Sequence, residues 1–154
     1  MIMPSKKPTT LWIGGSSNLT RTYINLLGHD ELVLAGLEER APAWIPKDAK
    51  FLSLDLTKTE FDPLIFKNIT SLIIGIQSPI WQDQNKMLLV GLKGFLDKAA
   101  KEGVQYLVHI SSLTKVDHLR NRRNKSDDDK SLGLVEGPYD EFVRQSEELI
   151  NQYH

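Results

Sequence analysis

Short apolar runs alternate with longer amphipathic segments along most of the chain. The runs fall at residues 10–13, 32–37, 50–54, 69–76 and 104–111. Each has the length of a strand, and the run at 69–76 is almost entirely apolar, which is typical of a strand covered on both faces. Strands separated by helix-length crossovers indicate a parallel sheet with helices on both sides. We therefore predict an α/β domain with a doubly wound parallel sheet of five strands in the order 3-2-1-4-5.

The segments between the runs carry helical periodicity. The first predicted helix ends at Gly28, and one face of it collects Leu19, Tyr23, Leu26 and Leu27. The strongest helix pattern covers 85–101 and stops at Gly103, with an apolar stripe of Leu88, Leu92, Phe95, Leu96 and Ala99. A last helix is indicated by Phe142, Ser146, Leu149 and Ile150. Residues 41–48 read as a loop, and 57–66 as a short helix or turn with Pro63 in its first turn.

A glycine-containing turn follows the first strand directly and leads into the first helix. Strand, glycine turn, helix and second strand form the arrangement with which proteins bind dinucleotides, because backbone N–H groups and the helix N-terminus can approach a pyrophosphate. Only the first glycine of the usual G-x-x-G-x-x-G spacing is present, as Gly14, and Ser17 and Thr20 occupy the other two positions. We therefore expect weak dinucleotide binding, which replacing both side chains by glycine should tighten.

Composition narrows the classes of function. With 154 residues the chain fits one domain, and its net charge of −1 gives no electrostatic reason to expect nucleic acid or an anionic membrane as a partner. It contains no cysteine, has no apolar run of membrane-spanning length, and shows no His, Asp and Glu spacing typical of a metal site. The N-terminus lacks the apolar stretch of a signal peptide, so we expect a cytoplasmic protein.

One stretch interrupts the alternation of strands and helices. Residues 115–137 are polar and highly charged, without periodicity. Such a segment inside a compact domain is commonly a mobile loop or an ordered lid over a substrate. We treat residues 1–154 as a single Rossmann-like domain in which 115–137 forms a mobile loop.

Four motifs in this order resemble the atypical short-chain dehydrogenases/reductases, of the NmrA-like or extended epimerase type. Residues 13–19 (IGGSSNL) stand where that family has TGATGNVG, and 54–57 (LDLT) resemble its GDLTD motif. Residues 103–112 (GVQYLVHISS) resemble the strand GVKRFVYISS. Tyr139 with 147–150 (EELI) resembles YxxxK…EEL, with Val143 in the lysine position. The resemblance covers nearly the whole chain and implies an NAD(P)-binding domain.

The resemblance implies a set of cofactor contacts in this sequence. The pyrophosphate turn would consist of Gly14, Ser16, Ser17, Asn18 and Leu19. Asp55 and Leu56 would lie against the adenine, with capping of a helix near Thr57 as the alternative for Asp55. Gln77 and Ser78, at the end of the fourth strand, would lie near a ribose.

Two charged residues bear on the choice between NAD and NADP. Glu38 is either a ribose 2′-OH acceptor, which favours NAD, or a solvated charge. Arg40 is either a partner of the NADP 2′-phosphate or likewise solvated. The two residues lie so close in the sequence that the choice between the cofactors stays open.

The resemblance also implies a catalytic set, in which Tyr139 and either Ser112 or Thr114 would polarise a substrate oxygen. The family's lysine lowers the pKa of this tyrosine and binds the nicotinamide ribose, and Val143 can do neither. Arg144 follows it, but one residue is about 100° around a helix. A tyrosine with a pKa near ~10 is a poor acid or base at neutral pH.

Two functional hypotheses follow from these motifs. The first is an NAD(P)-dependent oxidoreductase or epimerase, and the second is a non-catalytic module that senses a dinucleotide or docks to a partner. A protein partner or a homodimer is compatible with either. Family members continue with a sixth strand and a substrate-binding region, so we expect little turnover from this chain alone.

Overall fold

The computed structural model describes residues 9–76, 82–110 and 138–153, with the backbone alone at 82–83 and 138–140. One sheet contains β1 (Thr9–Ile13), β2 (Leu32–Gly36), β3 (Lys50–Ser53), β4 (Ile69–Ile74) and β5 (Tyr106–His109). All neighbouring strands are parallel, and their order is β3-β2-β1-β4-β5. The predicted doubly wound sheet is confirmed, including its reversal of order at β1.

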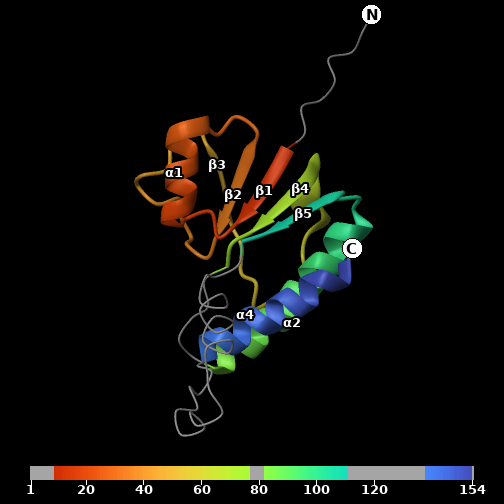
Figure 1. Ribbon diagram of the computed structural model, residues 1–154. Coiled ribbons are helices and arrows are strands. Elements are labelled where there is room, and N and C mark those ends of the chain that lie inside the picture. The colour runs from red at the N-terminus through yellow and green to blue at the C-terminus, as the bar shows by residue number, and fades with distance from the viewer. Residues whose placement is uncertain (1–8, 77–81, 111–137, 154) are drawn as a thin grey trace, which may run out of the picture.

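Helices cover the two faces of this sheet (Figure 1). Helix α1 (Asn18–Leu27) lies on one face, and α2 (Gln82–Lys101) and α4 (Pro138–Ile150) pack side by side on the other. Two short 3₁₀ helices complete the described chain, at Pro63–Phe66 and Asn151–Tyr153. None of the described helices has a stretch long and apolar enough to cross a membrane.

The larger core lies between the sheet and the pair α2 and α4. Leu11 and Ile13 of β1 contribute to it, as do Leu72 and Ile74 of β4. The predicted stripe of α2 is confirmed, because each of its members is buried here: Leu88, Leu92, Phe95, Leu96 and Ala99. The ring of Phe95 meets Phe61 edge-on, with the two ring centroids 5.1 Å apart. The inner face of α4 is buried, and it carries Phe142, Ser146 and Ile150.

The smaller core lies under α1, and the leucines of the predicted apolar face of α1 do not fill it. Leu19, Leu26 and Leu27 are 52%, 76% and 72% exposed, whereas Thr20 and Ile24 are buried. The Thr20 hydroxyl donates to the carbonyl oxygen of Gly14 at 3.5 Å and lies 3.0 Å from the hydroxyl of Ser17. Through these hydrogen bonds the polar residue Thr20 lies on the inner side of α1. A pattern of apolar residues cannot detect a buried polar one.

Helix α2 packs against the loop after β3 because two of its residues have no side chain. A Cβ on Gly91 would collide with the carbonyl oxygen of Leu56, and a Cβ on Gly94 would lie 2.7 Å from that of Thr59. Real Cβ atoms essentially never approach backbone oxygens so closely. The close approach fixes Leu56 against the same helix that carries Leu88.

We therefore predict that Gly91→Ala destabilises the protein. Glycine-to-alanine replacement inside a helix normally adds about 1 kcal/mol of stability, but here overpacking against backbone should reverse the sign and cost about 1–3 kcal/mol. Chemical denaturation would measure the free energy of unfolding. Val90→Ala, at the neighbouring and 59% exposed position, is the matched control. A stabilising Gly91→Ala would contradict the packing.

Candidate functional site

The turn after β1 brings the carboxyl ends of β1 and β4 into close contact. Gly14 adopts a φ of +80°, and a Cβ at this position would collide with the carbonyl oxygen of Gly75. The Gly75 N–H donates to the carbonyl oxygen of Ile13 at 2.9 Å. Gly14 is therefore required both by its conformation and by the approach of Gly75. A contact of Gly14 with a pyrophosphate stays a prediction.

The N-terminus of α1 begins directly above this contact. Ser17 is the N-cap, and its hydroxyl accepts from the Thr20 N–H at 3.3 Å. The remaining N–H groups of a first helical turn have no partner within the helix and carry a partial positive charge. Asn18 and Leu19 form this turn, and their side chains are exposed. Ser17 and Thr20, which we expected to hinder a phosphate, thus support the turn itself.

A cavity of about 320 Å³ opens at the carboxyl edge of the sheet beside this turn. Among the predicted site residues it brings together Gly14, Ser16, Ser17, Glu38 and Leu56. The rest of its lining was not predicted, and consists of Ile13, Ala35, Leu37, Leu54, Gly75, Ile76 and Leu88. Most of these follow or end a strand, so the rule that ligands bind at carboxyl ends could have found them. Leu88 belongs to α2. The apolar stripe of that helix predicted that Leu88 is buried, but not that it lines a cavity.

Glu38 and Arg40, which the sequence could not separate, differ in position. The Glu38 carboxylate folds back over Gly36, where a Cβ would collide with it and would lie 3.3 Å from the Ser16 hydroxyl. Glu38 therefore lines the cavity beside the turn, whereas Arg40 is exposed and is not part of the lining. The carboxylate is the only charged side chain that the described residues contribute to the lining.

Asp55 lies next to the cavity but does not line it. Its carboxylate accepts from the Thr57 hydroxyl at 2.6 Å and from the Thr57 N–H at 3.0 Å. These two hydrogen bonds, the hydroxyl first, lower the pKa of the Asp55 carboxyl below its ordinary value. The alternative of a helix cap was wrong, because the bonds close a turn and the nearest helix begins only at Pro63, capped by Asp62. An adenine contact stays a prediction.

The predicted catalytic residues are only partly described. Ser112 and Thr114 lie outside the described residues, as do Gln77 and Ser78 of the predicted cofactor set. The backbone of Tyr139 forms the first turn of α4. Four residues later, Val143 is buried, with 8% of its surface exposed.

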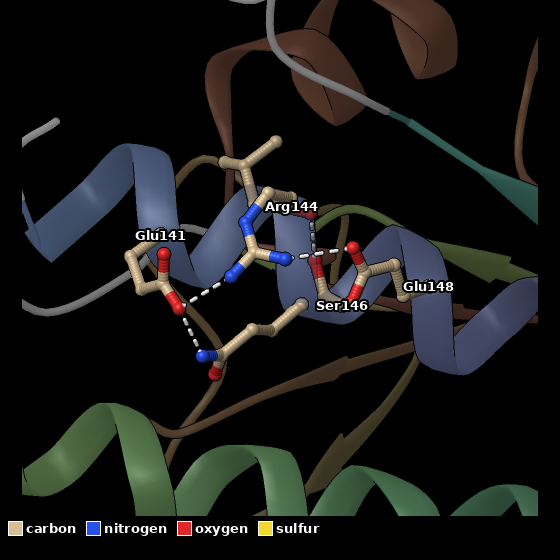
Figure 2. Close-up of polar contacts among 6 residues, drawn as sticks. Glu141, Arg144, Ser146 and Glu148 are labelled. Carbon is tan, nitrogen blue, oxygen red and sulfur yellow. Dashed lines mark hydrogen bonds and ion pairs between the residues drawn. The ribbon is translucent and has the colours of Figure 1, made fainter.

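Arg144 does not substitute for the missing lysine. It points away from the sheet and binds Glu141 and Glu148, each at 2.7 Å, on the outer side of α4 (Figure 2). Both carboxylates raise the pKa of the guanidinium, which stays charged. The described residues therefore place no basic side chain on the inner side of α4 at position 143 or 144.

The described residues were also compared with the ligand sets of metal sites. No group of three or more His, Cys, Asp or Glu side chains lies there in an arrangement that could hold a metal ion.

Comparison with solved structures identifies the fold. A short-chain dehydrogenase/reductase superfamily protein from Agrobacterium tumefaciens with bound NAD matches with a TM-score of 0.65 and 17% identity, over 94% of this chain and 44% of its own. The Bordetella bronchiseptica enzyme WbmG in complex with NAD matches with a TM-score of 0.69 and 14% identity, over 99% and 52%. The Citrobacter sp. triphenylmethane reductase complexed with NADP(H) matches with a TM-score of 0.63 and 12% identity, over 94% and 46%.

The chain shares its Rossmann-like α/β fold with these solved structures. This chain spans about half the length of these solved proteins. No protein-family model and no curated protein matches the sequence. The likeness to the solved structures is therefore one of fold.

We predict that Ser17→Ala lowers the free energy of unfolding by about 1 kcal/mol, because it removes the N-cap of α1. Thr22→Ala is the control, since its hydroxyl is exposed and bonds only to the preceding turn; it should change stability by less than about 0.5 kcal/mol. Thermal and chemical unfolding would measure both. Equal effects of the two substitutions would mean that Ser17 does not hold the turn.

Proposed function

We propose that this chain binds a nicotinamide dinucleotide in the cavity at the carboxyl ends of β1, β2 and β4, and that it prefers NAD to NADP. The observation that supports this most directly is the Glu38 carboxylate, which lines the cavity at the end of β2 beside the α1 turn. The bound NAD or NADP of the similar solved structures supports the same class of ligand.

The cavity offers each part of a dinucleotide a suitable chemical surface. The Gly14–Ser17 turn and the first N–H groups of α1 provide donors for a pyrophosphate, without a side-chain cation. Leu54, Leu56 and Leu88 provide an apolar wall of the kind that an adenine ring covers. These donors and this apolar wall line the same cavity as Glu38.

Electrostatics favours NAD over NADP. A carboxylate accepts hydrogen bonds from the ribose hydroxyls of NAD, whereas the 2′-phosphate of NADP would bring a like charge to the same place. Arg40, the group that could neutralise such a phosphate, lies outside the cavity lining. The preference thus follows from which of the two residues reaches the cavity.

Calorimetric titration tests the preference. We predict that the wild type binds NAD more tightly than NADP, and that Glu38→Gln weakens NAD binding about tenfold, because a charge-assisted hydrogen bond contributes about 1.5 kcal/mol. The same substitution should strengthen NADP binding, since it removes the repulsion. Glu39→Gln is the matched control: it removes the same charge at an exposed neighbour outside the lining.

Two results would contradict this proposal. If the protein bound neither NAD nor NADP, the proposal of a dinucleotide cofactor would be contradicted. Equal losses in Glu38→Gln and Glu39→Gln would show that the net charge, and not the position of Glu38, determines the preference.

We propose that any hydride transfer with the bound nicotinamide uses Tyr139 and Ser112 or Thr114 to polarise a carbonyl or hydroxyl substrate. Val143 is buried in the lysine position, so this position supplies no ammonium that would lower the phenol pKa. We therefore expect slow turnover. We also propose a cytoplasmic location, a reducing compartment that suits a chain without cysteine.

Val143→Lys is predicted to lower the pKa of Tyr139, because one helical turn separates the two residues and an ammonium favours the phenolate. The buried position should also cost stability, since a charge loses solvation there. Ultraviolet absorbance titration, read against Tyr139→Phe with Val143→Lys, isolates this phenol. The control is Arg144→Lys, whose ammonium lies on the outer side of α4.

An unchanged titration of Tyr139 in Val143→Lys would contradict the placement of the pair. Rapid turnover of carbonyl substrates by the wild type that survives Tyr139→Phe would contradict the proposed catalytic set.

A further inference from the structure

We draw no further inference here: the strongest candidate, the cavity of about 240 Å³ between β5 and α4 that His109 and Glu147 help to line, carries none because both residues already have interaction partners and nothing in the structure shows which ligand the cavity would take.

Discussion

The contact between Gly14 and Gly75 is the constraint on which the candidate site depends. A side chain on Gly14 would occupy the place of the Gly75 carbonyl oxygen, so β1 and β4 can meet at their carboxyl ends only through bare backbone. The hydrogen bond from Gly75 to Ile13 holds this approach. On its other side β1 pairs with β2, and the chain leaves the sheet after Ile13. It does so as the α1 turn, and the cavity is the space beside that turn.

The walls of the cavity depend on a second close approach, between α2 and the loop after β3. Gly91 lets the Leu56 carbonyl lie against the helix, so that Leu56 and Leu88 both reach the cavity. Packing on the α2 and α4 face thus determines the shape of a site that opens at the edge of the sheet. The α1 face contributes the turn, and on this face Tyr106 and Val108 of β5 are exposed. The two faces of the sheet therefore serve different purposes.

The sequence predicted most of the fold and about half of the described site. Strand positions, sheet order and the α2 stripe followed from periodicity, because those side chains are buried for the reason that periodicity measures. The burial of Thr20 under α1 was not predicted, because it depends on hydrogen bonds to Gly14 and Ser17. Glu38 could not be separated from Arg40, since the difference depends on how a carboxylate folds over Gly36. Contacts between distant segments, such as Gly14 with Gly75, leave no local trace.

The proposed cofactor contacts and the proposed catalytic residues belong to physically separate parts of this molecule. The proposed dinucleotide contacts come from β1, α1, β2, the end of β4 and the loop after β3, which close contacts and hydrogen bonds fix. Helix α4 is held differently: Phe142, Val143 and Ile150 are buried on its inner side, while Arg144 is neutralised by two glutamates on its outer side. A valine at position 143 satisfies that packing without any ligand. Hence the same fold can keep a dinucleotide site whether or not α4 carries the groups that activate a tyrosine.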